Sequence, residues 1–302
     1  MASLDRTIRF FEDRGIDKTS ALRVVACHVS LTHYSLDTME TKIAWLSELG
    51  LSDDKINVTI MRHPNILGIS FDKLNAIKEW YIKHGVSEKK LPYVFNVFPQ
   101  AASSSIEANL EPKVKLLKKN GFSDSQVARA LSLTPQVFTH SVDKLQSNID
   151  YLADVGVPRE ELPRMVAMMP QCLGMKQERI QATLNAADEM FGPETALEVL
   201  LSNCRIVTYN INGMRRAFKY LVSLGFAPER LQMNTRYITR SVNGILRPRS
   251  KFLIAQGVDV VMTVNWIMLP EKHFIERYPD YTEYLRQYKA RQRKKLAAIA
   301  AA

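Results

Sequence analysis

The sequence is poor in cysteine and lacks the cysteine patterns of disulfide frameworks and zinc sites. Its three cysteines, Cys27, Cys172 and Cys204, are odd in number and far apart. A disulfide framework uses paired cysteines, and a structural zinc site uses closely spaced ligands. The nearest candidate cluster, Cys27 and His28 with His33, matches no zinc spacing. We therefore expect no metal, no disulfide framework and a reducing compartment.

Sequence signals for membrane spans and common enzymes are also missing. No run of about 18 consecutive apolar residues occurs, which is roughly the length that a membrane-crossing helix needs. The glycine-rich dinucleotide and Walker-type phosphate loops, the HExxH zinc helix and the GxSxG nucleophile turn are absent, and the six histidines are scattered. We therefore predict no membrane partner, no cofactor and no catalytic residue.

Positive charge is in excess, and the excess is concentrated in the second half of the chain. The formal net charge is +10. Residues 151–302 hold 22 basic and 14 acidic side chains, and residues 205–251 hold ten cations against one acid, Glu229. Such a field attracts a polyanion, and the planar guanidinium of arginine suits phosphate, so the charge favours nucleic acid as a partner. The alternative is an ordinary solvated basic surface.

Glycine is scarce, but its spacing indicates an internal repeat. Eight of the twelve glycines recur at steps of 32 to 36 residues. Segments 35–50, 70–85 and 141–156 align without gaps; each opens with Ser, has Asp two residues later and ends on a repeat glycine. These are the start and stop signals of one helix, and its apolar residues recur at helical spacing. The repeat glycines are Gly15, Gly50, Gly85, Gly121, Gly156, Gly192, Gly225 and Gly257.

A second, shorter helix follows each repeat glycine and ends at a proline in four copies. Ser or Pro near its start favours helix initiation. Pro64, Pro99, Pro135 and Pro170 each fall 14 residues after a repeat glycine, where the missing N–H and the ring stop a helix. Later copies are looser, and Ile206 takes the place of this proline in one of them.

The repeating unit is therefore helix, break, helix, and it must stack on its neighbours to bury its apolar stripes. We predict an all-α protein, a curved solenoid of about eight units in a single repeat domain over residues 1–285, closed by a C-terminal cap. Residues 286–302 form a basic tail, in which 286–295 carry six cations and no acid. This tail is either a basic arm that contacts phosphates or a solvated helix end.

Several motifs within the repeat resemble those of one family. The step Pro-x-x-Leu or Pro-x-x-Phe begins at Pro64, Pro135 and Pro170, and the helix opening Ser-x-Asp-Lys-Leu occurs twice. Near the C-terminus, ILRPR at 245–249 and EKHFIERY at 271–278 lie on either side of a repeat glycine. Together these motifs resemble the mitochondrial transcription termination factor (mTERF) family over residues 4–288.

This resemblance implies a fold and a setting. The fold is a half-ring of helical repeats whose basic inner path binds nucleic acid, and the setting is gene expression in an organelle. Members of the family that hold duplex DNA act as transcription terminators or roadblocks. Other members serve ribosome assembly or RNA processing, and the motifs do not choose between these roles.

The charge pattern and the resemblance together predict a set of nucleic-acid-binding residues. Its members are expected to be exposed, because they lie off the apolar stripe of a helix or in the basic segment. The set comprises Arg179, Arg205, Arg215, Arg216, Lys219, Arg236, Arg240, Arg247, Arg249, Lys251, Lys73 and Lys144. Arg249 has a structural alternative, in which it ties the last repeat to its neighbour.

The resemblance also implies extruded bases that stack on aromatic side chains. Phe138 and Tyr209 lie at equivalent loop steps and are the candidates for this role. The alternative is that both are core residues beneath the repeat loop. The three tryptophans are expected in the core.

These observations lead to three hypotheses of function. In the first, the protein is a noncatalytic, sequence-specific duplex DNA binding factor, a monomer on its DNA, that blocks an RNA polymerase in the mitochondrion or, alternatively, the chloroplast. In the second, it binds RNA or ribosomal RNA during organelle ribosome assembly or RNA processing. In the third, it is a protein-interaction scaffold.

The first residues do not resemble a transit peptide. Such segments lack acids, whereas Asp5, Glu12, Asp13 and Asp17 lie within the first twenty residues. Either the sequence starts at the mature form, which we favour, or the protein is not imported.

Overall fold

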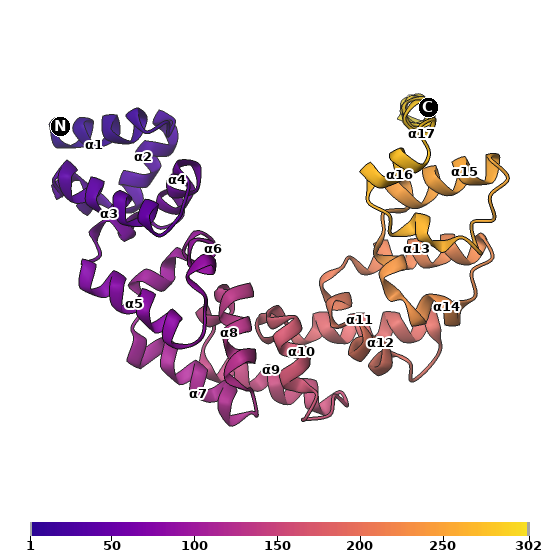
Figure 1. The fold of residues 1–302 in the computed structure, drawn as a ribbon, viewed down its shortest axis with the longest axis horizontal. Coiled ribbons are helices and arrows are strands. Elements are labelled where there is room, and N and C mark those ends of the chain that lie inside the picture. The colour runs from indigo at the N-terminus through magenta and orange to yellow at the C-terminus, as the bar shows by residue number, and fades with distance from the viewer. Residues whose placement is uncertain (1, 301–302) are drawn as a thin grey trace. The chain divides into compact units, whose positions relative to one another are not determined.

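All regular structure in the described part of the chain is helical. The computed structural model describes residues 2–300, and no strand forms within them. The predicted all-α repeat class is therefore confirmed (Figure 1). The helices group into two compact units, Met1–Met175 and Lys176–Ala302, whose boundary falls inside the predicted domain 1–285. The extent of that domain remains a prediction.

In the first unit long and short helices alternate, and a five-residue 3₁₀ turn follows each short helix. Each repeat runs from a short helix to the repeat glycine that ends the next long helix. Its long helices are α1 (Ala2–Asp13), α3 (Leu36–Glu48), α5 (Phe71–Lys83), α7 (Glu111–Lys119) and α9 (Val142–Asp154). Its short helices are α2 (Lys18–Cys27), α4 (Asp53–Arg62), α6 (Leu91–Val97), α8 (Asp124–Leu133) and α10 (Leu162–Met168). The 3₁₀ turns are η1 (Val29–His33), η2 (Pro64–Gly68), η4 (Pro99–Ser103), η6 (Pro135–Thr139) and η7 (Pro170–Gly174), and a shorter one, η3 (Glu88–Lys90), precedes α6.

The second unit continues the same pattern and ends with two further helices. Its long helices are α11 (Gln177–Phe191), α13 (Ile211–Ser223) and α15 (Arg247–Ala255), and its short helices are α12 (Ala196–Ser202) and α14 (Pro228–Met233). The 3₁₀ turns are η8 (Cys204–Thr208), η9 (Thr235–Thr239) and η11 (Val264–Ile267). The closing helices are α16 (Glu271–Arg277) and α17 (Tyr281–Ala300). The predicted basic tail thus lies mostly within α17, and its last two residues lie outside the described residues.

Serine and glycine mark the ends of the long helices, as the sequence predicts. The hydroxyls of Ser35, Ser70 and Ser141 accept hydrogen bonds from the backbone N–H three residues later, at 3.0, 3.3 and 3.2 Å. All eight repeat glycines have positive φ, from 74° to 111°. Because residues with a Cβ are strained there, glycine lets the chain leave the helix at low cost.

The repeat prolines begin a 3₁₀ turn, where the sequence had predicted only a break. Pro64, Pro99, Pro135 and Pro170 are the first residues of η2, η4, η6 and η7. The residue before each proline leaves the α conformation, with φ between −147° and −137°, because the proline ring clashes with a helical neighbour. The copy after Gly192 forms the same turn, η8, which begins at Cys204, so Cys204 and not the expected Ile206 takes the place of the proline. The turn therefore does not depend on proline.

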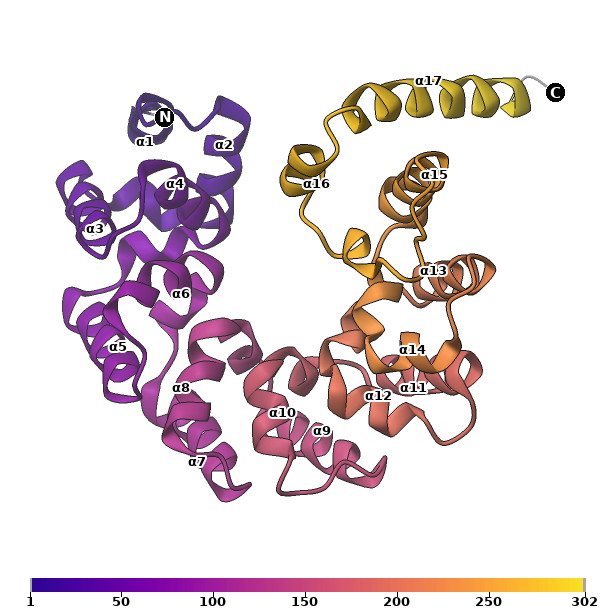
Figure 2. The ribbon, with the colours of Figure 1, turned by 45° about the vertical axis from the view of Figure 1, so that its right-hand side comes forward.

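Equivalent elements stack in rows within each unit. In the first unit α2, α4, α6, α8 and α10 pack on one another in that order, and neighbouring turns such as η1 and η2 also touch (Figure 2). In the second unit α11 packs on α13 and α12 on α14. The core lies between the rows: the stripe residues Met39, Leu74 and Leu145 are at most 1% exposed. All three tryptophans are buried, as predicted.

Two long helices begin with a π turn because they contain a proline one turn in. The π turns are η5 (Ile106–Leu110), which leads into α7, and η10 (Val242–Leu246), which leads into α15. Pro112 and Pro248 cannot donate a hydrogen bond, and their rings collide with the carbonyl four residues earlier in a regular helix. One extra residue in the turn relieves this clash, so the backbone N–H of Leu110 reaches Ser105 O at 3.1 Å. Neither π turn was predicted.

Replacing Gly257 with alanine should destabilise the second unit. Gly257 has φ +74°, and an added Cβ would meet no atom within 4 Å, so the cost is backbone strain alone, about 1 kcal/mol. Gly213→Ala is the matched control, because Gly213 lies inside α13 without positive φ, where alanine favours the helix by up to about 1 kcal/mol. Urea unfolding followed by circular dichroism measures both changes. Equal destabilisation by the two variants would contradict the strain argument.

Candidate nucleic-acid interface

Several polar side chains on the long helices hold the backbone of the next repeat. A 3₁₀ turn leaves carbonyl groups at its C-terminal end without a helical donor, and a buried carbonyl without a donor is costly. A side chain of the preceding long helix supplies that donor, and we call each such contact an inter-repeat latch. The latches join Arg6 to Thr32 and Tyr34, Lys73 to Ser103, Lys113 to Phe138, Asn148 to Leu173 and Met175, Arg179 to Val207 and Tyr209, and Arg249 to Trp266 and Leu269.

Arg249 is a buried latch. Only 4% of it is exposed, and its Nη1 donates hydrogen bonds to Trp266 O at 2.9 Å and Leu269 O at 2.6 Å. Its guanidinium lies 4.4 Å from the centre of the Phe274 ring, and burial lowers the pKa of the group. The expectation that Arg249 is exposed is therefore wrong, and this burial argues against a contact with nucleic acid. Its contacts are those of the structural alternative, in which it ties the last repeat to the C-terminal cap.

The three cations at the shared position near the start of the long helices are engaged in repeat packing. Arg179 donates from Nε to Val207 O at 3.2 Å and from Nη2 to Tyr209 O. Lys73 donates from Nζ to Ser103 O at 2.8 Å. Lys144 donates to Asn148 Oδ1 at 3.2 Å and so supports the latch that Asn148 makes. Lys73 is exposed, whereas Arg179 and Lys144 are half-buried, so the expectation of full exposure is wrong for these two.

Arg215 and Arg247 are half-buried and have partners on the surface of the second unit. The Nη2 atom of Arg215 lies 2.6 Å from Glu189 Oε2, in a pair whose side chains are 37% and 58% exposed. The Nη1 atom of Arg247 donates to Asn243 Oδ1 at 3.0 Å, and its guanidinium lies 5.3 Å from the centre of the Tyr220 ring. A surface ion pair such as Arg215–Glu189 contributes about 0–1 kcal/mol to stability, so a phosphate could displace Glu189 from Arg215.

Five of the predicted cations in the second unit are exposed and form no ion pair with any carboxylate in the described part of the chain. They come from four elements of this unit. Arg205 lies on η8, Arg216 and Lys219 on α13, Arg236 on η9, and Lys251 on α15. Because neither burial nor a partner neutralises them, these five cations are the strongest source of positive potential among the predicted residues.

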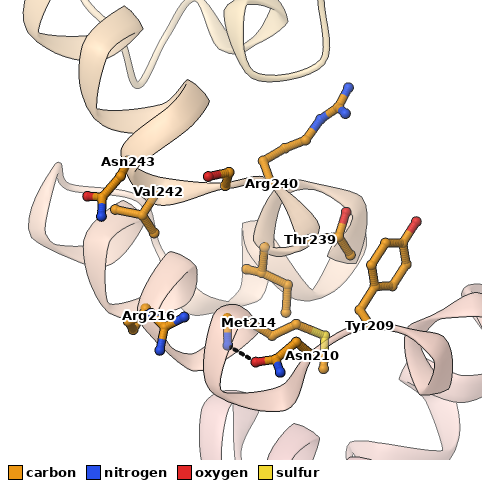
Figure 3. A pocket seen from close by; sticks show the side chains of 11 residues that line it. Tyr209, Asn210, Met214, Arg216, Thr239, Arg240, Val242 and Asn243 are labelled. Carbon is orange, nitrogen blue, oxygen red and sulfur yellow. Dashed lines mark hydrogen bonds between the residues drawn. The ribbon is translucent and has the colours of Figure 1, made fainter. Parts of the chain in front are cut away.

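A pocket of about 290 Å³ opens beside two of the predicted arginines. It lies between the start of α13 and the segment that leads from η9 into η10. Figure 3 shows Tyr209 and Arg216 on opposite sides of this pocket, with Asn210 and Met214 between them. No carboxylate lines it. The lining residues are Tyr209, Asn210, Gly213, Met214, Arg216, Ile238, Thr239, Arg240, Ser241, Val242 and Asn243.

The pocket's polar groups suit an anion. Two helix starts face it, capped by Asn210, which accepts from the Gly213 N–H at 2.8 Å, and by Ser241, which accepts from the Gly244 N–H at 3.1 Å. Backbone N–H groups at helix starts favour negative charge. Arg240 is half-buried and donates from Nη2 to Met268 O at 3.3 Å, while its buried Nε has no hydrogen-bond partner.

Tyr209 is more exposed than the equivalent aromatic residues of two earlier repeats. Those residues, Tyr34 and His140, lie over Gly68 and Gly174, so closely that a Cβ on either glycine would be 2.4 Å from the Tyr34 hydroxyl or the His140 ring. The residue at the position of these glycines opposite Tyr209 is Thr239, which also lines the pocket. Tyr209 is 38% exposed. The missing glycine is the difference in the sequence at this step, and the repeat pattern alone did not bring it out.

Phe138 does not share this exposure. It lies in η6, is 1% exposed, and its carbonyl oxygen accepts the latch from Lys113. Phe138 is therefore a core residue, as the alternative expected, and this burial argues against a stacking role. The expectation that it lies at the same step as Tyr209 is wrong, because its equivalent in η8 is Val207. Lys113 was not predicted at all; it is 4% exposed, and burial lowers its pKa.

The described residues offer little support for other kinds of site. No three histidine, cysteine, aspartate or glutamate side chains there come close enough together to hold a metal ion. None of the helices in this part of the chain is both long and apolar enough to cross a membrane. Cys172 and Cys204 are buried, Cys27 is exposed, and none of the three forms a disulfide bond in the described part of the chain.

Comparison with known proteins shows that the chain is similar to proteins of the mTERF family. The mTERF family model matches residues 1–152 and 106–274. The chain is similar to the chloroplastic transcription termination factor MTERF8 of Arabidopsis thaliana, with 22% identity over 224 residues that cover 72% of this chain and 43% of that protein. It is also similar to the mitochondrial transcription termination factor 1b of Mus musculus, with 23% identity over 232 residues, 70% of this chain and 59% of that protein. The chain spans about half the length of these curated relatives.

Replacing Arg249 with alanine should destabilise the second unit by about 3 kcal/mol, since two carbonyl groups lose a charged donor. Arg216→Ala is the control: Arg216 is exposed, so its removal should change the free energy of unfolding by less than about 0.5 kcal/mol. Urea unfolding measures both values. Wild-type stability in the Arg249 variant would refute the assignment of Arg249 as a latch.

Proposed function

Because this chain belongs to the mTERF family, we propose that it is a noncatalytic, sequence-specific double-stranded DNA binding factor of an organelle that terminates or blocks transcription. The observation that carries this proposal is the set of five exposed, unpaired cations in the second unit, together with the acid-free pocket beside Arg216. Both relatives named above are described as transcription termination factors, one chloroplastic and one mitochondrial.

The five cations are proposed to contact phosphates. They are Arg205, Arg216, Lys219, Arg236 and Lys251, and they extend over two successive repeats. Most contacts between proteins and DNA go to the backbone and fix the protein on the duplex, whereas a few side chains read the bases. Arg215, Arg240 and Arg247 border this surface but have protein partners, so we assign them secondary roles.

The pocket is proposed to receive a base or a phosphate of the bound nucleic acid. Tyr209 offers a flat ring at one side, and Arg216 offers a cation at the other. Aromatic rings and guanidinium planes stack on bases irrespective of sequence, and phosphate is favoured by the helix starts. Of the two residues predicted to stack, only Tyr209 has the exposure that this role needs.

Binding and selection from a mixed pool would test this function. Fragments of organelle duplex DNA and transcribed organelle RNA are offered together at about 150 mM salt, where nonspecific electrostatic binding is weak. Recovery of one duplex site supports the proposal and justifies a roadblock assay with an organelle RNA polymerase. Recovery of structured ribosomal RNA instead would replace DNA with RNA as the partner. Recovery of neither would leave a protein-interaction scaffold.

Removing three of the five cations should weaken duplex binding and reduce its dependence on salt. In the variant Arg216→Ala, Lys219→Ala, Arg236→Ala, the slope of log K against log salt should become shallower by about 0.9 for each phosphate that is no longer neutralised. The control removes the same charge from exposed lysines of the first unit, with Lys55, Lys89 and Lys90 each replaced by alanine. Fluorescence anisotropy over a salt series gives both slopes. An equal loss of affinity in the control would contradict an interface centred on the second unit.

Removing the Tyr209 ring should weaken binding while leaving the fold intact. A stacked base is worth about 1–3 kcal/mol, so Tyr209→Ala should bind at least about fivefold more weakly. Tyr209→Phe keeps the ring and should bind like the wild type. Titration of the recovered duplex against both variants measures the difference. If phenylalanine weakens binding as much as alanine, the hydroxyl and not the ring makes the contact.

A further inference from the structure

The C-terminal helix α17 concentrates charge that the proposed interface does not use. Residues 281–300 contain six basic side chains and one acidic side chain, Glu283, so this helix carries +5 of the chain's net charge of +10. Glu283 is paired with Arg286 at 2.8 Å. The remaining cations with described side chains are Lys289, Arg291, Arg293 and Lys294; none is buried, and none pairs with a described carboxylate.

Aromatic packing fixes the first half of this helix on the last repeat. The rings of Tyr281 and Tyr284 each lie 5.3 Å from the Phe252 ring of α15, and Tyr281 lies 4.6 Å from Phe274 of α16. Tyr288 continues the stack 6.1 Å from Tyr284. Burial raises the pKa of Tyr281 to about 12, so this ring stays neutral in the packing. Figure 2 shows α17 running on from α16 past α15.

Three of the four free cations, Lys289, Arg293 and Lys294, lie on the sides of α17 turned away from the tyrosine stripe, at about 100° per residue. Arg291 lies beside the stripe, next to Tyr284, and is exposed as well. Several of these cations are three or four residues apart, and like charges at such spacings repel and destabilise a helix. A bound polyanion would relieve this repulsion. The packing of tyrosines therefore holds a cationic helix face toward solvent.

We infer that Lys289, Arg291, Arg293 and Lys294 form a second nucleic-acid contact, which binds phosphates without reading sequence. This inference rests on the proposed function and adds a separate binding element to it. The segment from residue 289 to 300 is roughly 18 Å long as a helix, enough to follow several phosphates of a duplex. This contact would act by charge, because the exposed side chains described in this half of α17 are mainly its cations.

The described surface of α17 fits nucleic acid better than a membrane. A helix that lies on a membrane presents an apolar face to the acyl chains. On α17 the aromatic stripe is already packed against Phe252, and no large hydrophobic side chain is exposed among its described residues. Charge without an open apolar face is typical of a surface that contacts phosphate.

The test neutralises these four cations in the full chain by replacing Lys289, Arg291, Arg293 and Lys294 with glutamine. A control variant removes the same charge from exposed lysines of the first unit: Lys55, Lys83, Lys89 and Lys90 to glutamine. Binding is measured to a duplex of about 25 base pairs with an arbitrary sequence, over a salt series. Circular dichroism checks that both variants keep the wild-type helix content and unfolding temperature.

The α17 variant should bind the arbitrary duplex at least tenfold more weakly at low salt, with a slope shallower by about 0.9 for each phosphate that the helix no longer neutralises. Its preference for a specific site over the arbitrary duplex should be unchanged or larger, because phosphate contacts carry no sequence information.

Three results would overturn the inference. If the wild type binds and the α17 variant matches it, this second contact does not exist although the proposed function stands. If the control variant loses as much affinity, the effect is one of net charge. If neither the wild type nor any variant binds duplex, the proposed function fails too, and loss of binding to phosphatidylserine vesicles in the α17 variant alone would identify a membrane contact instead.

Discussion

The backbone carbonyl groups at the ends of six 3₁₀ turns are the constraint on which the structure depends. Each repeat changes direction there, so these groups have no helical donor, yet they lie where the next repeat packs. The protein satisfies them with side chains from the preceding long helix, among them Arg6, Lys113, Asn148 and Arg249. One hydrogen-bonding requirement therefore fixes how one repeat sits on the next.

The two π turns show how the chain places such a donor in the interior. Pro112 and Pro248 force an extra residue into the start of their helices, and the residue after each proline, Lys113 or Arg249, is then buried against the following turn. Arg249 also lies over Phe274, whose ring packs against Tyr281 of α17. The arginine after Pro248 thus links the last full repeat to the aromatic cluster that holds the C-terminal helix.

The latches divide the basic residues into two classes with different consequences. Cations such as Arg179 and Arg249 donate hydrogen bonds to backbone carbonyl groups, and these contacts hold them in the packing of the repeats. Cations such as Arg216, Lys219 and Arg236 are exposed and unpaired with any described carboxylate, so they are available to a polyanion. The net charge of +10 therefore does not count cations that are available to a partner, because some of the basic side chains are engaged in the packing of repeats.

The sequence by itself determined the all-α class, the repeat and most helix ends, because these depend on local chemistry. Ser35 caps with its own hydroxyl, and a repeat glycine needs only its own backbone freedom. Only the tertiary structure decided which cations are free. Arg249 and Arg216 are both arginines on long helices of adjacent repeats, but one meets the carbonyls of the following turn and the other meets solvent.

The same distinction separates Phe138 from Tyr209. The sequence pattern treated them as equivalent, yet Phe138 lies within its 3₁₀ turn and is buried, whereas Tyr209 comes one residue after its turn, at the position of His140, and lines a pocket. Burial of this kind depends on a contact between residues about 30 positions apart, and a local pattern does not contain it. Periodicity therefore predicted where helices lie, while packing between repeats decided which side chains remain on the surface.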